Sequence, residues 1–530
     1  MALQSISERA GRDDISEITI TEQTPLVRKS PTLETDAIPT DQPGIFSSLP
    51  PFPTAIRRPQ NPDLLVGILT LVIFIASASG GFLNIPMIRV FEDILCRQYY
   101  DKIRNREDGA PIDEGMCKVD AIQSELAYLF AVMAALNAGL SCLSALPWGI
   151  AADRIGRRQI YAIGVTGMAL SIIWIMGIGW FNVIFPPRLI WISPVFYLLG
   201  GGNPVISAVV QGMTVDIVPE SQRAISLLRI SAGSMIGNLV SPALASLLMT
   251  ESGPWPPMGL AFFLIMVTVP LIFIIPETSK EDTDNDSDDI ASTGFKHRLA
   301  QSLRELKRSA TIFRSPSMVI LLLMCMLELP VILSTYMFLS QFASKRYDIL
   351  LKDTGYIQTA YGIAVCIACF IVLPLLSSFV MKPEAPSFLR MSDDRRRDLI
   401  FLQWSFIAMM AGTFILGISL SLAGFIIGLM VLAFGNGASS YIKSLATLYV
   451  SSDQRSRLFT ILGLAMIGSD LWASPSLAAL FSLGMRLGGR WIGLPYFGLF
   501  VLCVIMLILS LLMRLPKVPG DGGNESHDED

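Results

Sequence analysis

Charge is scarce in this chain. Of its 530 residues, only 16% are Asp, Glu, Lys or Arg, whereas 52% are hydrophobic. This balance is unlike that of an ordinary soluble domain, in which about a quarter of the residues are charged. The formal net charge of −4 provides no basic excess for binding nucleic acid. The composition therefore favours a membrane protein and argues against a nucleic-acid partner.

Residues that typically bind metals or perform catalysis are also few. The two histidines, His297 and His527, lie in polar segments, and the seven cysteines show no zinc-type spacing. Cys366 and Cys369 have a redox-type spacing but lie in an apolar run, which favours a packing role. The nucleotide-binding pattern G-x-x-x-x-G-K-[ST] is missing. We expect no enzyme activity, no metal site, no cofactor and no direct use of ATP.

Apolar runs of membrane-spanning length fill most of the chain, and each is near the ~20 residues that cross a bilayer as a helix. They lie at 64–88, 124–150, 159–181, 189–214, 224–249, 257–276, 317–340, 355–381, 399–421, 424–447, 457–482 and 491–514. The stretch 399–447 is too long for one span, and we place a tight turn within Gly417–Gly424. The sequence predicts an all-α membrane protein with twelve transmembrane helices.

Polar segments divide the chain into five parts. These are a tail at 1–60, a six-helix half at 61–276, a linker at 277–316, a second six-helix half at 317–515 and a tail at 516–530. The first tail is rich in Ser, Thr, Pro and Asp and has no signal-peptide run, so we expect it to be disordered. In the linker, Phe295–Phe313 has the pattern of an amphipathic helix that lies on the membrane surface.

Basic residues set the orientation, because they are enriched in cytoplasmic loops. They recur in every second loop, at Arg154, Arg157, Arg158, Arg223, 296–314, Arg390, 395–397, Arg455 and Arg457. With these loops and both tails inside, loop 91–120 is the one basic segment outside. It contains Cys96 and Cys117, 21 residues apart. On the oxidising side of the membrane the two can form a disulfide; the alternative is two free thiols.

The first inner loop has the most specific pattern in the chain. It reads Gly149-Ile-Ala-Ala-Asp153-Arg154-Ile-Gly156-Arg157-Arg158. This resembles the loop between the second and third helices of the major facilitator superfamily. The resemblance implies two pseudo-symmetric six-helix halves, transport by rocking of those halves, and an inner gate. We expect the gate to involve Gly149, Asp153, Arg154, Gly156, Arg157, Arg158, Asp216 and Arg223, with Arg157 or Arg158 paired to Asp216.

An internal repeat supports the two halves independently of the loop. Gly202-Asn203 recurs as Gly435-Asn436, and Ser241-Pro242 recurs as Ser474-Pro475. Both pairs recur at the same offset of 233 residues.

A narrower resemblance comes from the outer segments Arg89–Glu92 and Gln341–Tyr347. They are similar to a fungal branch of the superfamily that is distantly related to proton-coupled folate transporters and tetracycline-type exporters. Those relatives differ in the direction of transport, so this resemblance leaves the direction open.

Acids within the apolar runs are candidates for proton coupling, because burial disfavours a charged carboxylate and lets it exchange protons near neutral pH. Glu328 and Asp470 lie midway along their runs; the alternative is a structural pairing, for example with Lys443. The family architecture implies a central cavity. The candidate cavity residues are Asn84, Asn137, Asn203, Gln211, Asn238, Tyr336, Gln358, Tyr361, Asn436 and Lys443, and for each a bond between helices is the alternative.

Together these patterns predict a secondary transporter of a small organic molecule, coupled to protons and working in efflux as a functional monomer. The alternatives are a proton-symporting importer of an organic nutrient and a non-transporting sensor on the same fold. We expect a plasma-membrane location. A dileucine-like Glu22–Val27 segment leaves a vacuolar membrane as the alternative.

Overall fold

Helices account for almost all of the chain that the structure describes. A computed structural model describes residues 61–104, 112–219, 222–276, 315–381, 393–450 and 455–515, and no strand occurs within these ranges. The predicted tails and the linker helix Phe295–Phe313 lie outside the described residues.

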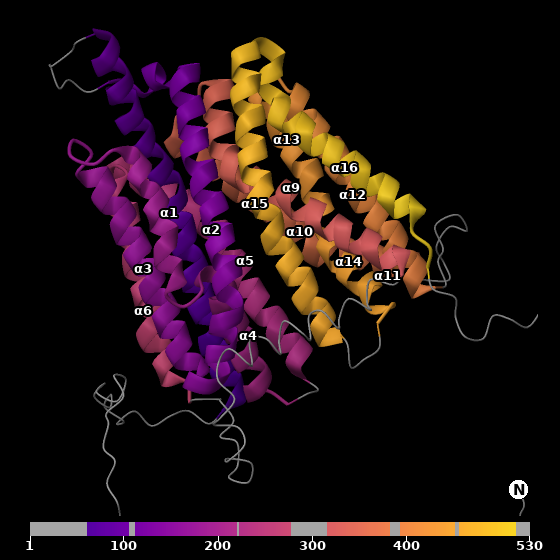
Figure 1. The fold of residues 1–530 in the computed structure, drawn as a ribbon. Helices are drawn as coiled ribbons and strands as arrows, with labels where there is room; N and C mark the ends of the chain where they lie inside the picture. The colour runs from indigo at the N-terminus through magenta and orange to yellow at the C-terminus, as the bar shows by residue number, and fades with distance from the viewer. Residues whose placement is uncertain are drawn as a thin grey trace, which may run out of the picture. The chain divides into compact units, whose positions relative to one another are not determined.

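The first half runs from Pro62 to Ile274 (Figure 1). Its elements are α1 (Pro62–Arg104), η1 (Glu114–Lys118), α2 (Asp120–Ile155), α3 (Arg157–Trp180), η2 (Pro187–Leu198), α4 (Gly202–Ile217), α5 (Arg223–Ser252) and α6 (Trp255–Ile274). The predicted run 189–214 is divided into η2 and α4 by three glycines with positive φ, Gly200–Gly202.

The second half runs from Pro316 to Leu512 and repeats this order. Its elements are α9 (Pro316–Tyr347), η5 (Leu351–Asp353), α10 (Thr354–Ile367), the π-helical η6 (Ala368–Val372), α11 (Leu373–Val380), α12 (Asp394–Ile418), α13 (Leu422–Ala433), η7 (Phe434–Gly437), α14 (Ala438–Thr447), α15 (Arg455–Leu487), η9 (Gly489–Gly493) and α16 (Leu494–Leu512). The break between α12 and α13 falls within the predicted Gly417–Gly424 turn.

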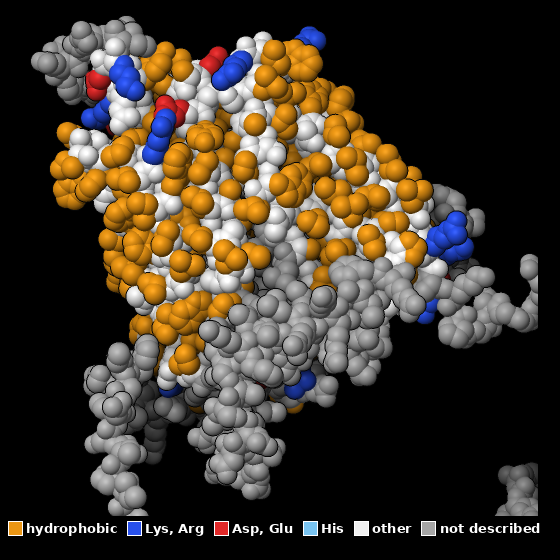
Figure 2. Space-filling view, viewed as in Figure 1, with side chains coloured by type: hydrophobic (Ala, Val, Ile, Leu, Met, Phe, Trp, Pro, Cys, Tyr) orange, Lys and Arg blue, Asp and Glu red, His pale blue; other side chains and the backbone are white. Residues whose placement is uncertain are grey.

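Ten helical runs of the described residues are long and apolar enough to cross a membrane. A shorter apolar helix, Pro316–Ile332, belongs to α9. With α9 and α15 added, the helices fill the twelve predicted spans. Figure 2 shows the matching surface: hydrophobic side chains cover most of the visible face, and charged side chains lie toward its ends.

The helix α1 is longer than its predicted span. Its 43 residues extend roughly 60 Å, about twice the thickness of the hydrocarbon core. Part of what was expected to be loop 91–120 is therefore helix, up to Arg104. We call the end of the bundle where α1 ends and α2 begins the outer end, following the orientation that the charges predict.

Two pairs of helices join the halves, α2 with α15 and α5 with α10 (Figure 1). Close approach of α10 to α5 depends on Gly355, where an added Cβ would lie 2.4 Å from the Pro242 carbonyl oxygen. The two prolines of the internal repeat, Pro242 and Pro475, thus each lie on one of these joining helices.

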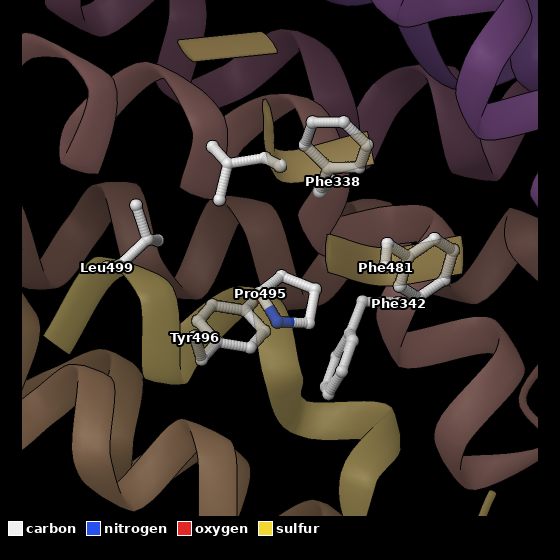
Figure 3. A pocket seen from close by; sticks show the side chains of 7 residues that line it. Phe338, Phe342, Phe481, Pro495, Tyr496 and Leu499 are labelled. Carbon is white, nitrogen blue, oxygen red and sulfur yellow. The ribbon is translucent and has the colours of Figure 1, made fainter. Parts of the chain in front are cut away.

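Aromatic packing holds the outer part of α9 within the second half. The Phe342 ring stacks on Phe425 at 5.6 Å between centroids and meets Tyr496 edge-on at 4.7 Å. Phe338 and Phe481 complete the cluster, as Figure 3 shows. These rings fix the helix turns that carry Gln341 and Lys345, which reach the first half.

Candidate functional site

A cavity of about 320 Å³ lies between the two halves. Helices α1 and α5 of the first half and α9 and α10 of the second half form its wall. The lining residues are Gly80, Gly81, Asn84, Met235, Asn238, Leu239, Pro242, Tyr336, Gln358, Gly362, Val365 and Cys366. The structure thus brings together four of the predicted cavity residues: Asn84, Asn238, Tyr336 and Gln358.

The wall of this cavity is polar but uncharged. Two asparagines, a glutamine and a tyrosine alternate with aliphatic side chains, and none of the lining residues is Asp, Glu, Lys or Arg. Gln358 is only 8% exposed, and its Oε1 has no hydrogen-bond partner among the described residues. A buried acceptor without a donor is costly, so this oxygen is poised to accept a bond from a ligand.

Tyr361 and Asn436 lie behind the cavity wall. The Tyr361 ring is 5.3 Å from that of Tyr336, and Asn436 Nδ2 donates to the Tyr361 hydroxyl at 3.1 Å. Tyr361 is fully buried. Tyr361 thus packs against Tyr336 on the side away from the cavity. For Tyr361 and Asn436, the structure shows a hydrogen bond between helices, which was the alternative to contact with a ligand.

Four other predicted cavity residues do not line this cavity. Asn137 accepts a hydrogen bond from Ser141, and Lys443 lies near Glu328. Asn203 and Gln211 are exposed on α4, and Gln211 donates to Ser207 at 3.1 Å.

A polar stripe on α4 was not identified from the sequence. Asn203, Ser207 and Gln211 are spaced by four residues and are all exposed, whereas Val205, Val209 and Val210 are buried. The offset of 233 residues maps this stripe onto η7 and α14, where Asn436 of η7 is followed by the exposed Ser440 and Ser444 of α14. Four-residue spacing combined with the repeat was the signal that could have found it.

Glu328 is buried within the second half. Its side chain is 1% exposed, and its Oε1 has no hydrogen-bond partner among the described residues. Lys443 of α14 interacts with it electrostatically, and the Ser439 backbone provides a hydrogen bond. An ionised carboxylate in such surroundings is held by one cation and one amide, so protonation of Glu328 would leave Lys443 without its counter-charge.

The predicted gate loop is a tight corner between α2 and α3. Gly156 turns it with φ of 112°, which few other residues adopt. Arg157 pairs with Asp216 at the end of α4 at 2.6 Å, as predicted for one of the two arginines. Gly212 makes room for this pair, because an added Cβ would lie 2.6 Å from the Arg157 guanidinium. This requirement for a glycine on α4 was not foreseen.

Arg158 turns away from the pair. It donates to the Ile275 carbonyl at 3.1 Å and lies over the Phe273 ring at 5.1 Å. The backbone of α2 includes Gly149, Asp153 and Arg154, but the side chains of those two charged residues are outside what the structure describes, as is that of Asp470. Arg223 begins α5 with an exposed side chain.

The corresponding corner of the second half is built differently. Asp398 of α12 accepts a hydrogen bond from Ser444 of α14 at 2.6 Å and pairs with its own neighbour, Arg397. An ion pair between helices in the first half is thus matched by a neutral donor in the second. The inner ends of the two halves are therefore unequal.

The predicted disulfide at the outer end is confirmed. Cys96 of α1 and Cys117 of η1 are bonded, with Cα atoms 5.3 Å apart. Both residues are fully buried.

Comparison with known sequences places this geometry among transporters. A family model described as Major Facilitator Superfamily matches residues 69–388. The MFS efflux pump atnC of Emericella nidulans is 27% identical over 82% of this chain and 84% of its own length. The efflux pump ustT of Aspergillus flavus is 26% identical over 82% of this chain and 85% of its own length.

Solved structures agree on the fold. A D-xylose–proton symporter superposes with a TM-score of 0.58 at 12% identity, covering 84% of this chain and 98% of its own. The human organic anion transporter MFSD10 superposes with a TM-score of 0.54 at 15% identity, covering 85% and 99%. At these identities the likeness concerns the arrangement of helices.

Proposed function

Because this chain belongs to the Major Facilitator Superfamily, we propose that it exports a small organic molecule across a membrane by alternating access, driven by an opposing flow of protons. The observation that carries the proposal is the cavity of about 320 Å³, which is lined by two helices of each half. A site on the boundary between two rigid bodies changes its access when they rock. Efflux is supported by the two fungal relatives, which are named efflux pumps.

The chemistry of the wall indicates the class of cargo. Asn84, Asn238 and Gln358 offer neutral hydrogen bonds, and no charged side chain lines the cavity to compensate an ionic ligand. Burying an uncompensated charge is costly. An uncharged molecule with an N–H or O–H donor for Gln358 and an apolar or aromatic body for Leu239, Val365 and Tyr336 fits best.

Glu328 is the proposed proton site. Its burial, the partnerless Oε1 and the neighbouring Lys443 make it the described carboxyl best suited to change protonation during a cycle. Asp470 remains a second candidate from its position in the sequence. The Arg157–Asp216 pair and the surrounding loop are the proposed inner gate, which acts on the accessibility of the same cavity.

The direction of coupling can be tested in proteoliposomes with an imposed pH gradient. An acidic lumen drives uptake only if protons leave in exchange for the cargo, and an alkaline lumen drives uptake only if protons enter with it. One-to-one exchange with about one pH unit supports roughly tenfold accumulation, because a pH unit is worth about 1.4 kcal/mol. We expect accumulation with an acidic lumen.

The probes are matched sets of aromatic compounds that differ only in carrying a hydroxyl, a carboxylate or an ammonium group. The neutral member should be accumulated most strongly. Accumulation with an alkaline lumen would instead establish a proton-symporting importer. Flux no greater than in protein-free vesicles, for every probe and both gradients, would favour the sensor. The protein is expected to act as a monomer in the plasma membrane, and a vacuolar location is the alternative.

A further inference from the structure

The outer end contains a buried network of polar side chains that has no role in the transport cycle proposed above. Glu92 of α1 is 1% exposed, and its Oε1 is 2.7 Å from both Lys118 Nζ and Gln123 Nε2. Arg89 bonds its other oxygen at 3.2 Å. These groups belong to the first half and lie around the Cys96–Cys117 disulfide.

Glu114 extends this network to the second half. One carboxylate oxygen lies 3.3 Å from Arg89 Nε, and the other lies 3.2 Å from Lys118 Nζ. The second oxygen also accepts the backbone N–H of Leu351 at 2.8 Å. Leu351 begins η5, which leads directly into α10. A carboxylate on the first N–H groups of a helix is favourable, since those groups have no partner within the helix.

Two further side chains make contacts between the halves at the same level. Lys345 Nζ pairs with Asp120 at 2.6 Å and also donates to the Lys118 carbonyl. Gln341 Nε2 donates to the Gln123 carbonyl at 2.8 Å. Asp120 and Gln123 lie in the first turn of α2, and Gln341 and Lys345 lie one turn apart on α9.

We infer that Glu114 and Lys345 are positioning residues that hold the halves together at the outer end, and that the Cys96–Cys117 disulfide keeps Glu114 in reach of Leu351. The short η1 helix carries Glu114, Cys117 and Lys118, and the disulfide fastens it to α1. Opening of the outer end breaks the contacts to Leu351, Asp120 and Gln123, whereas the bonds of Glu92 stay within the first half.

Contacts that break on every opening explain why Glu114 and Lys345 are charged and not apolar. A hydrogen bond or ion pair can break and re-form with water in each cycle, and its net contribution is only about 1 kcal/mol. An equally buried apolar contact would favour closure whatever the cavity contains. The disulfide reduces the freedom of η1 in the open state, so that Glu114 returns to Leu351 at little entropic cost.

Closure of the outer end can be measured by cross-linking. Ser124 of α2 and Ser482 of α15 have their hydroxyl oxygens 3.2 Å apart across the halves. In the full-length chain, Ser124→Cys with Ser482→Cys forms a disulfide when the outer end is closed. The rate under a mild oxidant reports the closed fraction. Chains that carry only one of the two substitutions correct for reactions of the native cysteines.

We expect Glu114→Gln, Lys345→Ala and the pair Cys96→Ser with Cys117→Ser each to lower the cross-linking rate, with a fall of roughly two- to tenfold in the closed-to-open ratio derived from it, the range that corresponds to one lost net hydrogen bond. Lys345→Arg should restore most of the rate. Arg188→Ala is the matched control, because Arg188 pairs with Glu125 at the same end but within the first half. It should leave the rate unchanged.

An unchanged rate in Glu114→Gln and Lys345→Ala, or an equal fall in Arg188→Ala, overturns the inference. Lys345 lies outside the disulfide-bonded segment, so its variant remains informative if removal of the disulfide prevents folding. Lys118 and Glu92 are not used, because truncating one partner of a buried pair destabilises the whole fold. The result does not depend on identifying the cargo, and it therefore stands or falls separately from the proposed efflux.

Discussion

At the residue scale, the proposed proton coupling depends on one side chain, that of Glu328. It is buried near Lys443 of α14. A glutamine has nearly the same shape but cannot release a proton. A Glu328→Gln protein should still exchange labelled for unlabelled cargo with no gradient, yet lose the roughly tenfold accumulation that about one pH unit supports.

Counterflow and gradient-driven uptake in the same proteoliposomes separate these two activities. Glu125→Gln is the control, since Glu125 is an exposed carboxylate at the outer end. If Glu328→Gln keeps full gradient-driven uptake, Glu328 is structural and Asp470 becomes the remaining candidate.

The Arg157–Asp216 pair gives a second prediction at this scale. Both side chains are partly exposed, so the pair contributes only about 0.2–1 kcal/mol. Reversing one charge, as in Asp216→Arg, replaces attraction by repulsion and should lower the transport rate severalfold. The double change Arg157→Asp with Asp216→Arg should recover part of the rate. A double variant no better than its parents would show that the individual side chains matter and their pairing does not.

At the scale of elements, the outer part of α9 depends on its aromatic packing. Phe342 is 1% exposed and touches Phe425, Phe481 and Tyr496. Phe342→Ala removes a large buried side chain, which costs about 3–5 kcal/mol in a packed core. We expect a clearly lower midpoint of thermal unfolding in detergent. Phe263→Ala, at an exposed position of α6, should have little effect. Equal midpoints for the two variants would contradict this assignment.

The elements themselves were largely predictable. Each apolar run is near the length of one span, and the Gly417–Gly424 turn separated the two runs that merge in the sequence. The extension of α1 to Arg104 was missed, because Arg89–Arg104 is too polar for a membrane run and its burial depends on η1 and α2. The partners of Glu92 and Glu114 were also missed, because they come from other segments of the chain. Leu351, which bonds Glu114, is 237 residues away in the sequence.

The candidate site was predicted in part. Asn84, Asn238, Tyr336 and Gln358 meet at one cavity because the family architecture places their helices at the centre. Asn137, Asn203 and Gln211 share the same residue types, but the rotation of each helix about its axis decides whether a polar side chain faces the cavity. That rotation is set by packing between distant helices, which a single sequence does not specify.

At the scale of the whole molecule, the outer ends of the halves are bonded together, whereas the stripe on α4 is exposed. A water-filled opening toward the inner end would explain the stripe. Ser207→Cys should then react with a water-soluble maleimide added to the cytoplasmic face, roughly tenfold faster than Val209→Cys, which is 5% exposed on the same helix.

Labelling of inside-out vesicles checks this, with the unmutated chain as the background. Equal, slow labelling of Ser207→Cys and Val209→Cys would mean that the stripe faces lipid or is covered.

The helix α1 runs past both the cavity and the outer polar network. Asn84 of α1 lines the cavity, and Glu92 lies about 12 Å further along the same helix within the outer network. Pro86 lies between them and lacks the amide that would bond one turn back, so the two segments can bend relative to each other without separating. Ligand binding at the cavity and closure of the outer end therefore both involve α1. If the two events are coupled through α1, thermodynamic reciprocity requires that closure of the outer end changes the affinity of the cavity for its ligand by the same factor by which bound ligand changes the closure equilibrium.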